Sequence, residues 1–171
     1  MEEETFKNFI ETELKKNPNY LKLSYLNISS EDSKAIAELL LQNTSIQYLD
    51  LTCNNLGDKG AQYISNSLKL NKTLEYLNLC CNNIGDEGGK SIARSLHESV
   101  GNNSTLKHLD LSMNKLGDET AFIFSEVLEK NSSLVTLSLR SNKFSSQEGV
   151  NSCLKILAIS TKSPNLKDVF I

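Results

Sequence analysis

The chain has 171 residues and a mass of 19.0 kDa, which suits a single domain. Hydrophobic residues make up 39% and charged residues 23%, a globular composition that argues against wholesale disorder. A net charge of -3, without any basic stripe, argues against a nucleic-acid partner. No apolar run approaches the ~20 residues of a membrane span, and the acidic start Met-Glu-Glu-Glu is unlike a signal peptide. We therefore expect a cytoplasmic protein that binds neither nucleic acid nor membrane.

Residues 1–17 are predicted to form a capping helix at the amino-terminal end of the domain. The apolar residues that share one face of this helix are Phe6, Phe9, Ile10 and Leu14. Pro18 follows the segment and ends it. An amphipathic helix of this kind can also contact a membrane or a partner, but the end repeats of stacked proteins need caps, which favours the capping interpretation.

Residues 18–171 repeat one motif, Leu-x-Leu-x-x-Asn-x-[Leu/Ile/Phe]. The first leucines of the four full copies are Leu49, Leu77, Leu109 and Leu137, at separations of 28, 32 and 28 residues. The same spacing finds Leu21 before these copies and Val169 after them. The sequence thus predicts five repeats and the opening strand of a sixth, starting near residues 18, 46, 74, 106, 134 and 166.

Each repeat changes its periodicity half way. The Leu-x-Leu alternation is typical of a short strand with one buried face, and stripes such as Ala61, Ile64 and Leu68 then indicate a helix. We expect the aspartates that follow glycine at the start of each helix to act as its N-cap, namely Asp58, Asp86 and Asp118. Stacking of such units predicts an α/β solenoid with a concave parallel sheet and convex helices.

An asparagine follows each predicted strand, where unpaired backbone groups of the turn need partners. Its amide can both donate and accept hydrogen bonds, which predicts a ladder between successive repeats. The ladder residues are Asn54, Asn82, Asn114 and Asn142. In the first repeat Leu26 stands at the aligned position and cannot take this role.

These motifs, together with Leu56-Gly-Asp-Lys-Gly, Ile84-Gly-Asp-Glu-Gly and Leu116-Gly-Asp-Glu, resemble the leucine-rich repeat family. The repeat length near 28 residues is similar to that of its ribonuclease-inhibitor-like subclass. The repeats are also similar to those of tropomodulin-type domains and of the sensing segments of innate immune receptors. The resemblance implies a horseshoe that binds a protein partner and has no catalytic residues, cofactor or metal.

The strand positions between and beside the leucines point away from the predicted core and form columns on the concave face. One column begins with three tyrosines, and tyrosine is enriched at binding surfaces. The candidate partner-binding residues are Tyr20, Tyr48, Asp50, Tyr76, Asn78, His108, Asp110 and Arg140. Aromatic columns also stabilise sheets without any ligand, so this second interpretation stays open.

The predicted face is small. Six strands of about five residues give an area on the order of 400–500 Å², below the ~800 Å² that each partner contributes to a standard interface. We therefore expect a helix, a loop or a tail as the bound segment.

Two other functions compete with a binding platform. Some GTPase-activating proteins, of the Ran activator type, are similar to this pattern, and Arg140 is the only arginine in the concave columns that could stabilise a transferring phosphoryl group. The chain can also be a fragment of a longer repeat receptor or of a bacterial effector delivered to the host cytosol. A catalytic set of Cys80, His108 and Asp110 is disfavoured, because an open sheet offers no oxyanion donors and does not exclude water.

The remaining signals concern cysteines, asparagines and the last strand. The four cysteines lack metal-ligand spacing, so we expect free thiols; Cys53 and Cys81 are predicted neighbours, and whether they bridge is left open. The Asn-x-Ser/Thr sites at the helix-to-strand returns are interpreted as turn residues and not as glycan acceptors.

Residues 166–171 are predicted to form an apolar edge strand, which predicts either edge-to-edge self-association or continuation into a longer chain.

Overall fold

The computed structural model describes residues 3–97 and 103–171, and in these ranges helices and strands alternate along the chain. The helices are α1 (Glu3–Lys16), α2 (Ser30–Gln42), α3 (Gly57–Leu68), α4 (Asp86–Ser95), α5 (Asp118–Val127) and α6 (Gln147–Lys162). The strands are β1 (Tyr20–Lys22), β2 (Tyr48–Asp50), β3 (Tyr76–Asn78), β4 (His108–Asp110), β5 (Thr136–Ser138) and β6 (Asp168–Phe170).

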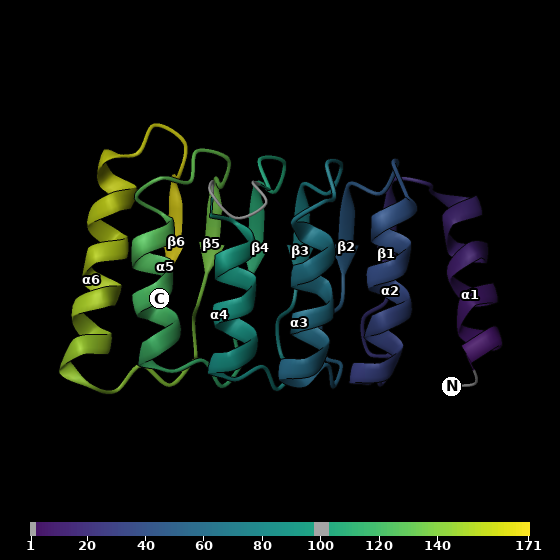
Figure 1. Cartoon of the computed structure of the whole chain (residues 1–171), viewed down its shortest axis with the longest axis horizontal. Coiled ribbons are helices and arrows are strands. Elements are labelled where there is room, and N and C mark those ends of the chain that lie inside the picture. Colours follow the sequence, from purple (N-terminus) through teal and green to yellow (C-terminus); the bar gives the residue numbers. More distant parts are fainter. Residues whose placement is uncertain (1–2, 98–102) are drawn as a thin grey trace.

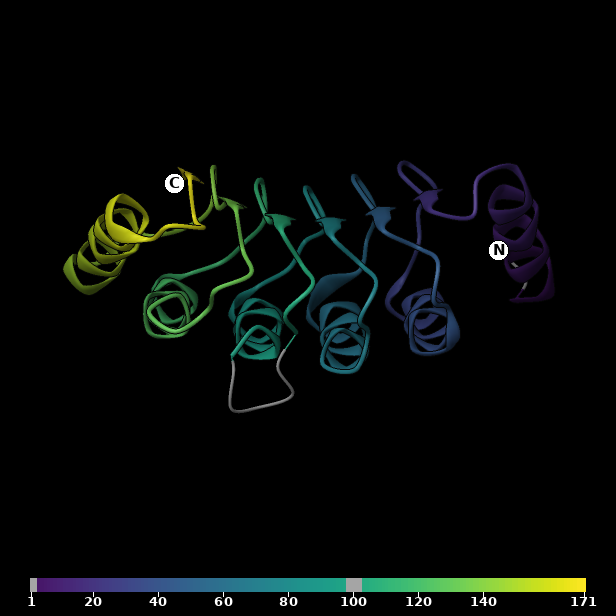
Figure 2. The ribbon, with the colours of Figure 1, turned by 90° about the horizontal axis from the view of Figure 1, so that it is seen from above.

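The strands form one six-stranded parallel sheet whose order, β1 to β6, follows the chain. The sheet and the helices lie in two layers, and α1 stands at one end beside β1 (Figure 1). Seen from above, the strands line the inner side of an arc and the helices its outer side (Figure 2). The predicted leucine-rich solenoid with a concave sheet is confirmed.

The strands are shorter than the five residues expected, at three residues each. The backbone ladder nevertheless continues beyond them, since the Leu51 N–H donates to the Asn78 carbonyl (2.9 Å) and the Cys53 N–H to the Cys80 carbonyl (2.9 Å). The regular part of the sheet is therefore shorter along its strands than expected.

The core lies between the layers and is built from columns of equivalent residues. Both leucines of each full Leu-x-Leu motif are buried, as are the helix residues that face them. One repeat shows the pattern: Leu77, Leu79 and Ile84 come from the strand and its turn, and Ile92 and Leu96 from the helix that returns. Complete burial of each such side chain contributes about 1.5–3 kcal/mol, and no repeat can bury its own set without a neighbour.

Helix α1 covers the amino-terminal end of this core. Phe6 and Ile10 are buried against the first repeat, and Phe9 and Leu14 pack partly against the same cluster. The division into a capping helix of residues 1–17 and a repeat domain of residues 18–171 stays a prediction. None of the helices within the described ranges combines the length and the apolar character that a bilayer crossing requires.

The asparagines that follow the strands bond to the turn of the preceding repeat. Asn114 is typical: its Oδ1 accepts hydrogen bonds from the N–H groups of Asn82 and Ile84 (both 3.0 Å), and its Nδ2 donates to the carbonyls of Leu79 (2.9 Å) and Leu111 (3.0 Å). Asn54 and Asn142 make bonds of the same kind. Each asparagine thus satisfies buried backbone groups of two repeats at once.

Asn82 departs from this pattern. Its Nδ2 donates to the Leu51 carbonyl (2.8 Å), but its Oδ1 is buried without a hydrogen-bond partner. The preceding turn differs from the others, since Gly57 has a φ of +58° and its N–H donates to the Asn82 backbone carbonyl (3.0 Å). The asparagine ladder is therefore incomplete between the second and third repeats.

A second asparagine series, at the opposite ends of the strands, does more than the simple turn role that the sequence predicts for it. Asn71 is buried; its Nδ2 donates to the Leu40 carbonyl (2.7 Å) and its Oδ1 accepts from the N–H of Leu74 (2.8 Å). Asn103 and Asn131 repeat this arrangement. These Asn-x-Ser/Thr sites therefore have a structural role that uses the amide nitrogen.

The expectation that the aspartates cap their own helices is wrong. Asp86 Oδ1 accepts hydrogen bonds from the N–H groups of Gly117 (2.9 Å) and Thr120 (3.0 Å), at the start of the next helix, and Asp58 bonds in the same way to the start of α4. Asp86 is itself the first residue of α4, whose N-cap is Gly85, so its side chain is past the position that can cap its own helix. Stacking instead places the next helix beside it. Gly117 permits this approach, because a Cβ there would collide with Asp86 Oδ2.

The incomplete ladder gives a stability prediction. Asn114→Ala leaves the N–H groups of Asn82 and Ile84 without their acceptor, so we expect it to lower the free energy of unfolding by about 2–4 kcal/mol. Asn82→Ala is the matched control, because its Oδ1 has no partner to lose. Urea denaturation followed by circular dichroism measures both variants. Equal losses would contradict the different roles of the two amides.

A second prediction concerns pH. Hydrogen bonds from the Ser146 hydroxyl and from the backbone amides of Ser145 (2.9 Å) and Ser146 (3.0 Å) hold the pKa of Asp118 below its ordinary value of 3.8. Because the folded state favours the carboxylate, its stabilising contribution is present above pH 3.8 and is lost as the pH falls through the lowered pKa. We expect the stability difference between the native chain and Asp118→Asn to shrink as the pH is lowered from about 5 to 2. Urea unfolding of both proteins over this pH range measures the stability difference. A stability difference that does not change with pH would contradict the prediction.

Candidate functional site

The first residues of the strands form a column of aromatic rings on the concave face. The register aligns Tyr20, Tyr48, Tyr76 and His108 on four adjacent strands. Ring centroids lie 4.4 Å apart for Tyr20 and Tyr48, 4.1 Å for Tyr48 and Tyr76, and 5.8 Å for Tyr76 and His108. The two tyrosine pairs are stacked, with interplanar angles of 19° and 9°. We call these four residues the aromatic column.

The two tyrosines at the centre of the column, Tyr48 and Tyr76, are half-buried. Burial raises the pKa of the Tyr48 hydroxyl well above its ordinary value of 10.0, and a hydrogen bond with Tyr76 raises it further. Tyr20, at the end of the column, has 38% of its surface exposed. The stacked rings hold one another in place, so their side chains have little freedom left to lose on binding.

The middle residues of the strands are partly committed to their own backbone. Oδ1 of Asp50, Asn78 and Asp110 accepts a hydrogen bond from the N–H two residues later, at 2.9, 2.9 and 2.8 Å respectively. Asp50 also accepts the Thr52 hydroxyl (2.6 Å) and is only 9% exposed. Within the described part of the chain, Oδ2 of Asp50 and of Asp110 is left for a partner, so each carboxylate offers one oxygen.

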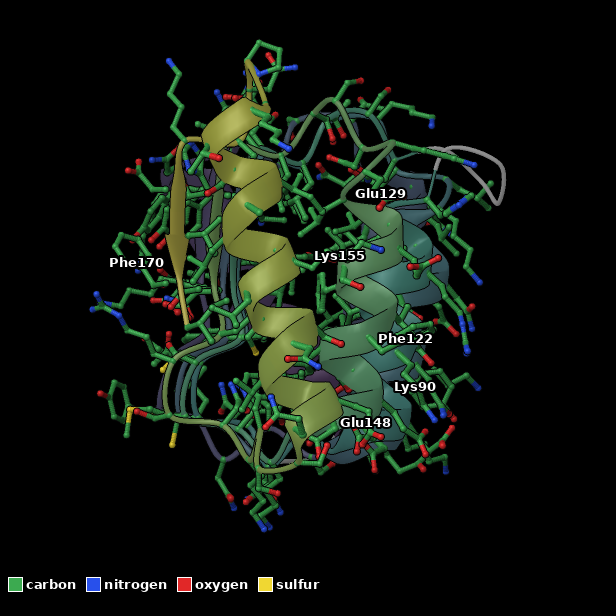
Figure 3. All side chains as sticks on the ribbon, turned by 90° about the vertical axis from the view of Figure 1, so that its left-hand side faces the viewer. Lys90, Phe122, Glu129, Glu148, Lys155 and Phe170 are labelled. Atoms are coloured by element: carbon green, nitrogen blue, oxygen red, sulfur yellow. The ribbon has the colours of Figure 1, made fainter. Side chains whose placement is uncertain are left out.

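A hollow of about 260 Å³ lies over β3 to β6 on the same face. Its lining residues are Tyr76, His108, Leu109, Asp110, Thr136, Ser138, Arg140 and Phe170. The Arg140 guanidinium stacks on the Phe170 ring, 4.4 Å from its centroid. Figure 3 places Phe170 on the side of β6 that faces away from α5 and α6. The hollow thus combines an aromatic wall, a cation and a carboxylate.

The structure brings together only part of the predicted site. Tyr76, His108, Asp110 and Arg140 share the hollow, whereas Tyr20, Tyr48 and Asp50 lie on β1 and β2 toward the amino-terminal end. Sequence reasoning did not select Phe170 as a site residue, although its place in the strand columns could have identified it. The Arg140–Phe170 contact could not be read from the columns, because it joins two different ones.

The cysteine on this face is not activated. Burial raises the pKa of the Cys80 thiol, a hydrogen bond with Ser112 partly offsets this, and the charge of Asp110 raises it further. The Nδ1 of His108 contacts the Thr136 hydroxyl. A nucleophilic cysteine requires a lowered pKa, whereas the pKa of Cys80 is raised. Residues 3–97 and 103–171 contain no group of three or more His, Cys, Asp or Glu side chains placed to hold a metal ion.

The aromatic column gives a testable distinction between ring stacking and hydrogen bonding. Tyr48→Ala removes both ring contacts, and we expect it to lower the free energy of unfolding by about 1–3 kcal/mol. Tyr48→Phe keeps the rings and is expected to cost less than about 1 kcal/mol. Urea unfolding of both variants measures the difference. Equal losses would show that the hydroxyl, and not the stacked ring, stabilises the column.

Comparison with known proteins identifies the architecture. Residues 42–65, 70–93 and 102–121 match the leucine-rich repeat family model, and no curated protein matches the sequence. A solved structure of leiomodin-1 actin-binding site 2 is similar, with a TM-score of 0.72 and 24% identity over 92% of this chain and 90% of that chain. The tropomodulin C-terminal domain of Caenorhabditis elegans has a TM-score of 0.67 and 17% identity over 95% of each chain. At these identities the two likenesses establish the fold alone. Because the matched stretches fall on successive strand–helix units that stack in one solenoid, the chain carries leucine-rich repeats of the kind that this family model describes.

Proposed function

We propose that this protein is a non-enzymatic interaction module that holds a helix, loop or tail of a protein partner on its concave face. The observation that carries the proposal is the aromatic column, which crosses four adjacent strands and leads into the hollow. Stacked rings supply a large contact area at a low entropic cost, as binding surfaces require. The three-residue strands favour a partner segment over a whole domain.

The proposed contact residues are of three chemical kinds: aromatic, acidic or amide, and basic. Tyr20, Tyr48, Tyr76 and His108 offer ring edges and polar tips along the groove. The free oxygen of Asp110 suits a lysine or arginine of the partner. Asp50 contributes less because it is only 9% exposed, and Asn78 contributes less because it carries no charge. Arg140, stacked on Phe170, suits an acidic group or a carbonyl.

Actin is the first partner to test, because the similar leiomodin-1 structure is that of an actin-binding site. A cytoplasmic location is part of this proposal. GTPase activation remains the alternative; in that case Arg140 would act on a transferring phosphoryl group and not on partner affinity.

The outer edge of β6 is a second proposed contact, through residues 166–171. Its strand pairs on one side with β5, and Leu154, Leu157 and Ile171 are exposed nearby. Unpaired strand edges favour pairing with another strand. Either a second copy of the chain or further repeats of a longer protein would cover this edge.

The binding experiment uses fluorescently labelled monomeric actin and filamentous actin in separate titrations. We expect Tyr76→Ala and Arg140→Ala each to weaken binding at least about tenfold, because both side chains line the hollow. Phe122→Ala is the matched control: this ring is 54% exposed on α5, in the convex layer (Figure 3). Circular dichroism verifies that each variant is folded.

The possible outcomes distinguish a wrong choice of partner from a wrong choice of binding surface. If the native chain binds neither form of actin, actin is the wrong partner. Affinity capture with the native chain and with the triple variant Tyr48→Ala, Tyr76→Ala, Asp110→Ala then tests the face itself. Equal recovery of the same partners by both would overturn the concave face as the binding surface. Unchanged affinity of Arg140→Ala together with a loss of stimulated GTP hydrolysis would favour the activator alternative.

A further inference from the structure

Two cysteines occupy the same position in neighbouring repeats, in the turn that follows each strand. Cys53 and Cys81 have left-handed backbone conformations, with φ of 55° and 56°. The Cys53 N–H donates to the Cys80 carbonyl (2.9 Å), so the register that pairs Leu49 with Leu77 continues to Cys53 and Cys81. The two residues are therefore direct neighbours across the sheet.

The geometry of this pair suits a disulfide. Neighbouring parallel strands lie about 4.8 Å apart, within the range of about 4.4–6.8 Å that separates the Cα atoms of bridged cysteines. The side chains of Cys53 and Cys81 are close enough to interact electrostatically, and the Tyr25 hydroxyl also interacts with Cys53. Both side chains are half-buried, at a corner that a small oxidant can reach.

The other two cysteines are placed differently. The Cys80 thiol interacts with Ser112 of the following repeat, and Cys153 is buried in α6 at the far end of the solenoid. They serve as internal controls for any oxidation of the pair.

We propose that Cys53 and Cys81 form a reversible disulfide when the protein meets hydrogen peroxide or a similar two-electron oxidant. One sulfur attacks a peroxide oxygen, which gives a sulfenic acid and releases one water after proton transfer. The second sulfur attacks the first; the S–S bond forms, the S–O bond breaks, and a second water leaves with the remaining thiol proton. Two thiols are oxidised, one peroxide is reduced to two waters, and an added dithiol reverses the reaction.

The equivalent positions of the two residues in adjacent repeats select this pair. The hydrogen bond with Cys53 raises the pKa of Cys81, and burial adds to this, so little thiolate is present at neutral pH. Oxidation is therefore expected to be slow but specific, since the register places the two cysteines at equivalent positions of adjacent repeats.

The bridge would join the two repeats between which the asparagine ladder is incomplete. The buried Oδ1 of Asn82, immediately after Cys81, has no partner, and the turn containing Gly57 departs from the other turns. A covalent link from Cys53 to Cys81 closes a loop that contains all of α3 and restricts opening at this junction. Oxidation would therefore stabilise the part of the solenoid whose polar groups are least satisfied.

The experiment treats the reduced full chain with hydrogen peroxide and follows free thiols, intact mass and oligomeric state. We expect the thiol count to fall from four to two per chain, with a mass loss of two hydrogen atoms and no dimer. In a Cys80→Ser background, we expect proteolytic digestion of the oxidised chain to release the Cys53 and Cys81 peptides joined by a disulfide. Cys153→Ser should leave this result unchanged, whereas Cys53→Ser and Cys81→Ser should each abolish it.

A thermal readout tests the stabilising role separately. The bridged Cys80→Ser, Cys153→Ser chain should melt several degrees above its reduced form, and dithiothreitol should reverse the shift. A bridge between Cys80 and Cys81, intermolecular dimers, or over-oxidation without a Cys53–Cys81 link would overturn the proposal. A bridge that forms without raising the melting temperature would overturn its role at the junction.

Discussion

Hydrogen bonds from the side chains of one repeat to the backbone of its neighbour are the interaction on which the rest of this structure depends. A turn at the end of a short buried strand leaves N–H and C=O groups that water cannot reach, and each unpaired group costs about 1–3 kcal/mol. Asn114 pairs five such groups from two repeats. The leucine columns drive the units together, but the buried amides decide in which register they stack.

The same principle operates on all sides of the core. The second asparagine series, including Asn71 and Asn103, pairs the turns at the opposite ends of the strands, and Asp86 caps the helix of the next repeat. Exposed ion pairs such as Lys155 with Glu126 and Glu129 also join neighbouring helices (Figure 3), although such pairs contribute little when solvated. Among the polar contacts between repeats, the buried ones therefore contribute most to stability, and the junction at Asn82 stands out because one of them is missing.

The candidate binding face follows directly from this register. Because each repeat adds one strand in phase, Tyr48 lies over Tyr76 at a ring separation of 4.1 Å without any contact dedicated to the purpose. The same phase brings Arg140 beside Phe170 at the carboxyl-terminal end. A shift of one residue in any strand would turn these rings into the core and the leucines out of it. The stacking that stabilises the sheet and the rigidity that a binding surface needs are therefore the same property.

Much of this protein could be predicted from its sequence, because a repeat reports which residues occupy equivalent positions. The leucine and asparagine spacing determined the parallel sheet, the helix layer, the aromatic column and the neighbouring cysteines. The tertiary structure alone decided which groups bond across repeats. Asp58 and Asp86 cap the following helix and not their own, Asp50 folds back onto Thr52, and Asn82 leaves one oxygen unpaired. Periodicity fixes the place of a residue within its own unit, whereas these contacts depend on the distance and rotation between stacked units, which arise only when the whole core packs.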